Sequence, residues 1–418
     1  MTNSKAHFWL ILLCCCFPVQ LLRAQAPVDK LIGSLQQAIN QRDSSLLVPY
    51  LAPDFAIFTS TWPNSGQMLQ SILAMGDSTC TVEPSGDKVG KLANGHTKLG
   101  LKYRFKGGSQ VKTSTMVLNR DGRIEYIDYF DQLYGLFRDK PSELVASVPF
   151  EREKGRIMVK LRLNDSAREL RFLFDTGADG MAITNALADS VGLKISRKQS
   201  TSVVGGNVKI QISSENTVHL GSVSVPRQNI AIFPNEHSNI DGIIGLNLAN
   251  SYIIGVDFDN SVLNLYSLGS FAYPKKSKTI PVTVPSGVAV LDARLNVSGK
   301  EELEGQFFFD TGANFSLVCF SPFVRQNQLL VGGFKYDKVG NMSSFGHNTT
   351  IYSGQAASFS IGNNKLITKP MPVTLQASSG KGNWSPSADG SLGIEFSKQY
   401  NFIINLVEKE INFSTRIE

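Results

Sequence analysis

Nearly the same seven residues occur twice in this chain of 418 residues, as FLFDTGA at 172–178 and as FFFDTGA at 307–313. The second string begins 135 positions after the first. That spacing is the size of a domain and is much longer than one unit of a short tandem repeat. The strings therefore predict two copies of one fold within the chain.

A second pair of matching strings supports the duplication. D-G-x-x-G occurs at 241–245 and again 148 positions later at 389–393, and the same offset then matches Tyr252 to Tyr400. Each copy has short alternating segments separated by Gly, Asn and Asp, for example 255–266, which is typical of an all-β, barrel-like lobe. We predict lobe 1 at residues 148–270 and lobe 2 at 280–418, joined by a polar linker at Ser270–Lys278.

The region before the repeat has a different pattern. Residues 28–40 carry apolar side chains three to four positions apart, which predicts a helix, and a second short helix is expected after Asp43. Residues 98–105, 111–119 and 123–130 have the composition of strands and are separated by the hairpin signals Lys106–Gly108 and Arg120–Gly122. Helices followed by a meander of strands predict an α+β domain at residues 27–140.

A loose pattern runs through this first region, in Ala38-Ile39, Arg42-Asp43, Leu47, Leu51–Phe55, Gly122–Ile124 and Phe130-Asp131. On these residues the region resembles the NTF2-like (SnoaL-like) family, whose members are enzymes or binding modules. Because no motif places a His/Asp pair here, we expect a non-catalytic accessory domain with a ligand that the sequence does not identify.

The N-terminus has the features of an export signal at residues 1–26. Lys5 precedes an apolar run from Phe8 to Pro18, and small residues follow at Ala24 and Ala26. Cleavage after Ala24 and cleavage after Ala26 are both open, and an uncleaved anchor is the alternative. The apolar run is short for a membrane span, so we expect an exported protein, periplasmic or secreted, without a stable span after cleavage.

Composition excludes several classes of function. The formal charge is +6 without a basic cluster, which gives no footprint for nucleic acid. Five scattered histidines and the absence of a C-x-x-C motif give little support for a metal site, so we expect no metal and no other cofactor. Beyond the export signal the chain keeps Cys80 and Cys319, for which a disulfide is allowed but not required.

The repeated string suits one kind of chemistry. Three apolar residues form a buried strand that delivers an aspartate, Asp175 or Asp310, and Gly177 or Gly312 then allows a tight turn. Thr176 and Thr311 can hydrogen-bond across to the partner loop. Two carboxylates brought face to face share a proton, so that one can act as base toward water and the other as acid toward a carbonyl.

On the two DTGA strings and the two D-G-x-x-G strings, both copies resemble the aspartic protease superfamily, in particular its retropepsin-like bacterial members. The resemblance implies two pepsin/retropepsin-like β-barrel lobes, an intramolecular dyad of Asp175 with Asp310, a protein or peptide substrate, and activity as a monomer. It implies substrate-binding roles for Asp179 and its counterpart Asn314, and flap tips at 204–207, with Gly205 and Gly206, and at 344–347. A plain hairpin turn is an equal alternative for either tip. Ser391 stands where the family normally has an apolar residue.

Three other interpretations remain open on the sequence. Each DTG could be a strand-to-turn junction in which the aspartate caps the turn. The repeat could be a degenerate protease scaffold that serves, with the NTF2-like domain, as a binding or interaction protein. The two lobes could also fail to face each other, in which case each would need a partner copy from another molecule.

Overall fold

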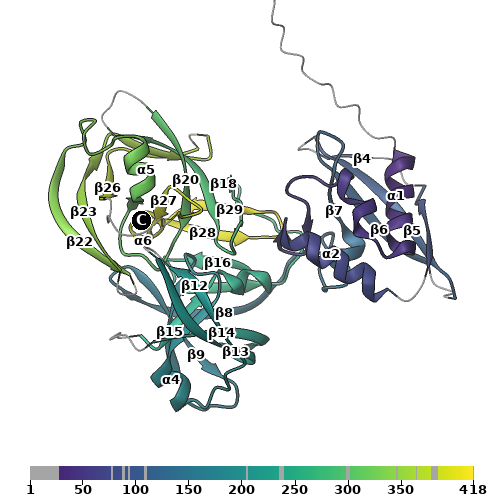
Figure 1. Ribbon diagram of the computed structural model, residues 1–418, viewed down its shortest axis with the longest axis horizontal. Helices are drawn as coiled ribbons and strands as arrows, with labels where there is room; N and C mark the ends of the chain where they lie inside the picture. The colour runs from purple at the N-terminus through teal and green to yellow at the C-terminus, as the bar shows by residue number, and fades with distance from the viewer. Residues whose placement is uncertain are drawn as a thin grey trace, which may run out of the picture. The chain divides into compact units, whose positions relative to one another are not determined.

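The computed structural model describes residues 28–76, 79–86, 90–92, 95–107, 111–203, 206–234, 240–297, 302–344, 347–363, 365–377 and 385–417. The predicted export signal lies outside these residues. The described residues fall into two compact units, one made of 28–55 with 70–127 and the other of 56–69 with 128–417 (Figure 1). Among the described helices none is long and apolar enough to cross a membrane.

The first unit is α+β, as its sequence pattern predicts. Its elements are α1 (Val28–Gln41), the 3₁₀ turns η1 (Ser44–Leu46) and η2 (Val48–Tyr50), β3 (Cys80–Pro84), β4 (Gly90–Lys91), β5 (Thr97–Phe105), β6 (Val111–Leu118) and β7 (Ile124–Ile127). Helix α1 buries Leu31, Ile32, Leu35 and Ala38, the stripe expected of a helix with one face in a core. The resemblance to the NTF2-like family stays a prediction.

One strand of this meander is shorter than its pattern predicts. β7 ends at Ile127, and α3 (Asp128–Gln132) takes residues that were expected to continue the strand to 130. The alternation fails there because Asp128 and Asp131 are buried and both pair with Arg138, at 3.8 Å and 2.7 Å. Two buried carboxylates need this cation, and the helical turn brings both to it.

The second unit is mainly β, which confirms the predicted fold class. Before the repeat it contains β1 (Ala56–Ile57) and β2 (Ser60–Thr61), and α2 (Asn64–Met75) follows them in the chain. Copy one contains β8 (Leu144–Glu153), β9 (Arg156–Leu163), β10 (Leu170–Asp175), β11 (Met181–Thr184), α4 (Asn185–Ser190), β12 (Arg197–Val203), β13 (Gly206–Leu220), β14 (Val223–Phe233), β15 (Gly242–Gly245), η3 (Leu246–Asn250), β16 (Ile253–Asp257) and β17 (Val262–Tyr266). Copy two contains β18 (Ser277–Pro281), β19 (Val290–Asn296), β20 (Glu302–Phe309), β21 (Leu317–Cys319), α5 (Ser321–Gln326), β22 (Tyr336–Ser344), β23 (His347–Ala356), β24 (Ser358–Ile361), β25 (Leu366–Thr368), β26 (Met371–Gln376), β27 (Gly390–Leu392), α6 (Ile394–Ser397), β28 (Tyr400–Asn405) and β29 (Glu410–Thr415).

The two copies order their strands in the same way. Copy one follows β12-β13-β14-β11-β15-β10-β9, and copy two follows β22-β23-β26-β21-β27-β20-β19. In both, the strand that carries DTG pairs in parallel with the strand of the D-G-x-x-G string, Phe172 with Gly242 and Phe307 with Gly390. The internal repeat in the sequence is therefore an internal repeat in the fold.

A central sheet joins the copies in the order β8-β17-β16-β28-β29-β18 (Figure 1). At its middle β16 and β28 run antiparallel, and Gly255 lies opposite Ile403, its own counterpart 148 positions later. On either side, Ile254 pairs with Ile404 and Val256 with Phe402. A pairing in which a residue meets its own counterpart is the sign of a two-fold axis, here between two halves of one chain.

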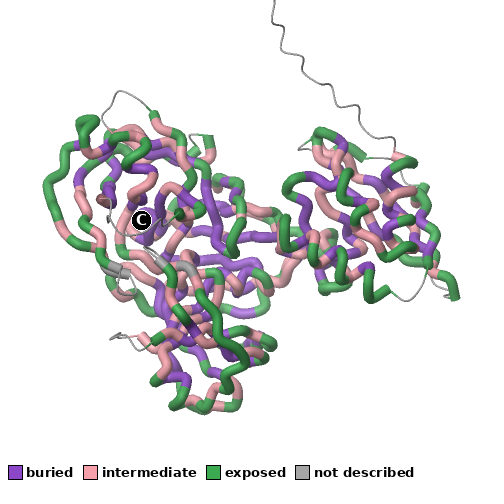
Figure 2. Tube along the Cα trace, in the orientation of Figure 1, coloured by how far each residue is buried: buried purple, intermediate pink, exposed green. Residues whose placement is uncertain are grey.

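One continuous core fills both copies and the central sheet. Its buried residues run from Ala146 to Phe413 and come from strands and short helices of both repeats. Phe309, the residue before Asp310, packs edge-to-face on Phe402 of β28 with ring centroids 5.1 Å apart. The outer strands β12 and β22 are mostly exposed, whereas β15 and β27, in the interior of the two sheets, are mostly buried (Figure 2).

The predicted linker is only partly a linker. Ser277 and Lys278 belong to β18, which pairs with β29 at the edge of the central sheet. Upstream, Tyr273 accepts a hydrogen bond from Asn405 at 3.0 Å. The polar composition gives no sign of this strand. An edge strand packs only one face, and the side chains on its other face remain polar.

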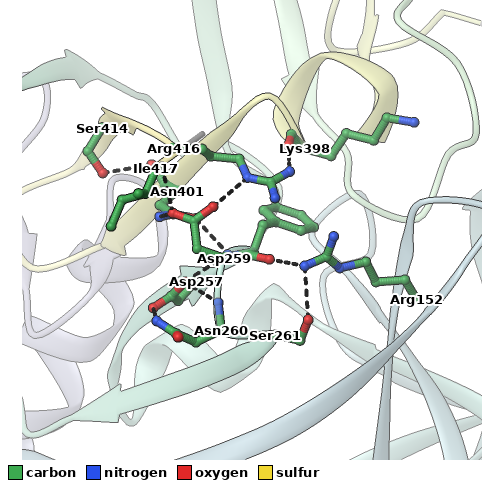
Figure 3. Close-up of polar contacts among 11 residues, drawn as sticks. Arg152, Asp257, Asp259, Asn260, Ser261, Lys398, Asn401, Ser414, Arg416 and Ile417 are labelled. Carbon is green, nitrogen blue, oxygen red and sulfur yellow. Dashed lines mark hydrogen bonds and ion pairs between the residues drawn. The ribbon is translucent and has the colours of Figure 1, made fainter.

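The far turn of the central sheet is held by the C-terminal residues (Figure 3). Asp259, in the turn between β16 and β17, accepts hydrogen bonds from Arg416 Nε at 2.8 Å, Asn401 Nδ2 at 2.7 Å and the Ile417 N–H at 3.0 Å. Arg416 also donates to the Lys398 carbonyl at 3.0 Å. Hydrogen bonds from Arg416 and from the Ile417 N–H lower the pKa of Asp259. Residues of copy two thus fix a turn of copy one.

We expect Arg416→Ala to lower the free energy of unfolding by about 1–2 kcal/mol near neutral pH, since it removes charge-assisted hydrogen bonds from a partly buried carboxylate. Because the folded pKa of Asp259 is depressed, this contribution is present above the unfolded aspartate value of about 3.9 and is lost as the pH falls through the folded pKa. Denaturant unfolding of both proteins, at neutral and at acidic pH, measures it.

The matched control is Arg294→Ala, which breaks the exposed pair with Glu304 at 3.2 Å. An exposed pair of this kind is worth under about 0.5–1 kcal/mol, so this variant should stay near wild type. Equal losses in the two variants would contradict the role given to Arg416.

Candidate active site

The aspartates stand at the ends of buried strands. Phe172 and Phe174 of β10 are fully buried, and Asp175 lies opposite Gly245 of β15 at the end of the parallel pairing. Phe307 and Phe309 of β20 are likewise buried, and the Asp310 N–H donates to the Leu392 carbonyl of β27 at 3.0 Å. The apolar residues before each aspartate therefore fix its position from behind.

The D-G-x-x-G strings support these strands in two ways. Asp241 accepts the Arg171 N–H at 2.7 Å, and its counterpart Asp389 accepts the Gln306 N–H at 2.8 Å. At Gly242 a Cβ would lie 2.5 Å from the Ala182 carbonyl oxygen, so only glycine allows the strands to pack this closely. The sequence marks these positions as a repeat, but the hydrogen bonds made by Asp241 and Asp389 depend on the sheet register and were not predicted.

The two DTG loops exchange hydrogen bonds through their threonines. Thr176 Oγ1 donates to the Phe309 carbonyl at 2.6 Å and accepts the Thr311 N–H at 3.0 Å. Thr311 Oγ1 donates to the Phe174 carbonyl at 2.8 Å and accepts the Thr176 N–H at 3.1 Å. Both threonines are fully buried, so each loop satisfies backbone groups of the other. This reciprocal set holds the loops face to face.

The facing loops bring the two carboxyl groups into contact. The side chains of Asp175 and Asp310 are hydrogen-bonded to each other. Each also lies against the glycine of the opposite loop: a Cβ on Gly312 would be 2.2 Å from Asp175 Cγ, and a Cβ on Gly177 would be 2.5 Å from Asp310 Cγ. The loops can approach only because both residues are glycine.

The contact between two acids sets their protonation. Burial, and then the charge of Asp310, raises the pKa of Asp175 well above its ordinary value. Burial also raises the pKa of Asp310, against which hydrogen bonds from Ser391 and other donors act. Two carboxyl groups this close share one proton and titrate as a pair. Such a pair can act as base toward water and as acid toward a carbonyl oxygen at the same time.

The serine of the second D-G-x-x-G string is part of this site. Ser391 is buried, with 3% of its surface exposed, and its Oγ donates to Asp310 Oδ2 at 2.9 Å. The sequence shows only that a polar residue stands where an apolar one is expected. The strand register, in which Ser391 lies opposite Phe308, places its hydroxyl at the aspartate.

The other site residues that the sequence predicts lie in turns after the DTG strings or at the tips of hairpins. Asp179 and Asn314 are exposed in the turns after the two DTG strings, and a Cβ on Gly287 would lie 2.8 Å from Asp179 Cβ. Gly206 begins β13 and pairs with Val203, whereas Gly205 lies outside the described residues. The second tip is a hairpin that pairs Ser344 with His347, and 345–346 are also outside the described residues. Substrate-binding roles for these residues stay predictions.

Neither of two hollows on the surface contains the aspartates. One, of about 450 Å³, is lined by β12, β13 and β14, including Lys198 and Ile210. The other, of about 500 Å³, is lined by β19 and β20, including Arg294 and Gly305. In the part of the chain that the structure describes, no group of three or more His, Cys, Asp or Glu could hold a metal, and Cys80 and Cys319 are free and buried.

Comparison with known proteins bears on the first of the two copies. Residues 159–248 match the protein-family model described as aspartyl protease. This segment runs from β9 through β15 to the start of η3, and it includes Asp175 and the first D-G-x-x-G string. A search of the curated proteins found no match.

Among solved structures, the chain is similar to the aspartic proteinase from Irpex lacteus. The two share 13% identity, the match covers 65% of this chain and 97% of that one, and the TM-score is 0.42.

Proposed function

We propose that the chain is an aspartic endopeptidase, which hydrolyses peptide bonds with Asp175, Asp310 and a water molecule. The observation that carries the proposal is the pair of contacting aspartates, one from each repeat. The match of residues 159–248 to the aspartyl protease model supports it. A shared proton gives one base and one acid in one site, which is what addition of water to an amide requires.

Both halves of the site come from one chain, so we infer that the monomer is active. The threonine exchange between the loops and the pairing of β16 with β28 support this inference. A peptide between the lobes would meet an acid from each copy. In the described structure Asp179 of copy one and Asn314 of copy two differ in charge, which would make the two sides of a substrate unequal.

The test is cleavage of an unfolded protein and of a mixed peptide library by the full mature chain, from acidic to neutral pH, with fragments identified by mass spectrometry. We expect internal cleavage that is strongest at acidic pH, where the pair holds one proton. A statine-type transition-state analogue should block cleavage, and a metal chelator should not. Absence of cleavage at every pH, in a protein shown to be folded, would contradict the proposal.

We also propose that the chain is exported and then cleaved, on the strength of residues 5–26 of the sequence. N-terminal sequencing of the mature protein should start at Gln25 or at Pro27. A mature protein in the cytoplasmic fraction that keeps Met1 would contradict export.

A further inference from the structure

The two repeats differ at one position beside the aspartate pair. Ser391 of β27 lies opposite Phe308, as Ile243 of β15 lies opposite Leu173, and the offset of 148 makes Ser391 and Ile243 counterparts. The serine hydroxyl donates to Asp310 at 2.9 Å. The side chain of Ile243 has no hydrogen-bond donor and cannot make this contact with Asp175. The two carboxyl groups therefore differ in their hydrogen bonds, although the repeats are otherwise similar here.

The hydrogen bonds around the two carboxyl groups are unequal as well. Asp310 Oδ2 accepts from Ser391, and Asp310 Oδ1 accepts the N–H groups of Gly312 and Ala313 at 3.1 Å and 3.0 Å. Asp175 Oδ1 accepts the Gly177 N–H at 2.9 Å. In copy one the Ala178 N–H donates instead to the backbone carbonyl of Asp175, at 3.2 Å.

Donors that point at a carboxyl group stabilise its ionised form. The Gly312 N–H acts on both carboxyl groups and therefore does not separate them. The strongest other influences on the pair are burial, which acts on both aspartates, and the interaction between Asp175 and Asp310 themselves. The Gly177 N–H acts on Asp175 alone and is matched by the Ala313 N–H, which acts on Asp310 alone. The contact without a counterpart on the other acid is thus the Ser391 hydroxyl.

We propose that Ser391 is a positioning residue that holds the negative charge on Asp310 and leaves the shared proton on Asp175. This deepens the proposed function and rests on it for the assignment of roles in hydrolysis. Asp310 is then the base that takes a proton from water, and Asp175 is the acid that protonates the peptide carbonyl oxygen.

The step balances without any further reactant. Water oxygen bonds to the carbonyl carbon while one water proton goes to Asp310 and the Asp175 proton goes to the carbonyl oxygen, which gives a gem-diol. The C–N bond then breaks as Asp310 gives its proton to the leaving nitrogen. A diol proton returns to Asp175, so both acids end as they began.

The first experiment measures protonation directly and does not depend on activity. In an Asp175→Asn background, ¹³C NMR titration of labelled aspartate carboxyls follows Asp310 without its partner. We expect Ser391→Ala to raise the pKa of Asp310 by about one unit, the size of one hydrogen bond to a charged group. Ser391→Thr, which keeps the hydroxyl, should restore the wild-type value. In an Asp310→Asn background, Ser391→Ala should leave the pKa of Asp175 unchanged.

The second experiment is the pH profile of kcat/KM in the otherwise wild-type chain. The acidic limb reports protonation of the charge held on Asp310, so Ser391→Ala should move that limb to higher pH by about one unit and leave the basic limb in place. Ile243→Ser offers a donor to the protonated member instead and should move the basic limb to lower pH. Thermal melting of each variant establishes that it is folded.

The outcomes separate this inference from the proposed function. A shift of the Asp310 titration in a chain that cleaves nothing would uphold the charge assignment and contradict the protease. Cleavage by the wild type with no shift of Asp310 in the Ser391→Ala variant would overturn the role of Ser391 and leave the protease standing. If Ser391→Ala lowered kcat equally at every pH and left both limbs of the profile in place, the role of Ser391 would be structural only. That result would overturn the inference.

Discussion

Asp175→Asn and Asp310→Asn should each lower the rate of peptide hydrolysis by at least ~10³-fold, with little change in stability. An asparagine keeps the shape of the side chain but can neither take up the proton of the attacking water, as one acid must, nor protonate the carbonyl oxygen, as the other must. Because the two acids share one proton and act in one step, loss of either removes the whole cycle rather than half of it. The measurement is kcat/KM on one cleaved peptide.

The control for this pair is Asp165→Asn, which changes an exposed aspartate of copy one that lies in the turn after β9. It should keep wild-type activity. Two independent active sites, one in each lobe, would instead leave about half of the activity in each single variant. That result would contradict the reading of the repeat as two halves of one site.

Gly312→Ala should lower kcat/KM by about 10²-fold, because the added methyl group would lie 2.2 Å from Asp175 Cγ and must displace the carboxyl group. Gly177→Ala, with 2.5 Å to Asp310 Cγ, should have a similar effect. The displacement moves the two acids apart. The pKa of the aspartate that carries the shared proton should therefore also fall toward its ordinary value. Steady-state kinetics and carboxyl titration measure the two effects.

Gly180→Ala is the matched control, since it lies in the same turn as Gly177 and a Cβ there meets nothing within 4 Å. We expect it to be folded and active. If all three alanine variants kept wild-type activity, the close approach of the loops in the structure would be wrong. If Gly180→Ala lost as much activity as Gly312→Ala, general stiffening of the turn would explain the loss instead.

The repeat could be predicted from the sequence because both loops must meet the same physical demands. Each needs a buried strand, an aspartate, a threonine and a glycine at fixed spacing, so the DTGA strings of 172–178 and 307–313 persist while their surroundings differ. Local hydrophobic periodicity and strand composition separately located α1, β5 and β6, because these signals lie within each segment. A duplicated fold followed from the strings, and the structure confirms it as two sheets with one strand order.

Other features depend on contacts between residues far apart in the chain, and periodicity carries no signal for them. Residues 56–69 belong to the second unit, where Thr59 bonds to Asn250 at 2.8 Å, although they lie within the segment predicted as the first domain. The sequence predicts a linker at Ser277 and Lys278 because β18 is an edge strand, and an edge strand keeps polar side chains on the face that does not pack. The hydroxyl of Ser391 reaches Asp310 only through the register of β27 with β20.

The measurement that tests the central claim most directly is the activity of an equimolar mixture of Asp175→Asn and Asp310→Asn chains. If the pair forms within one chain, each variant lacks one of its two acids and no mixture can rebuild a site. The account therefore predicts that the mixture is as inactive as the separate variants. Recovery of a substantial part of the wild-type activity on mixing would show that the acids pair between chains, and it would contradict the single-chain active site.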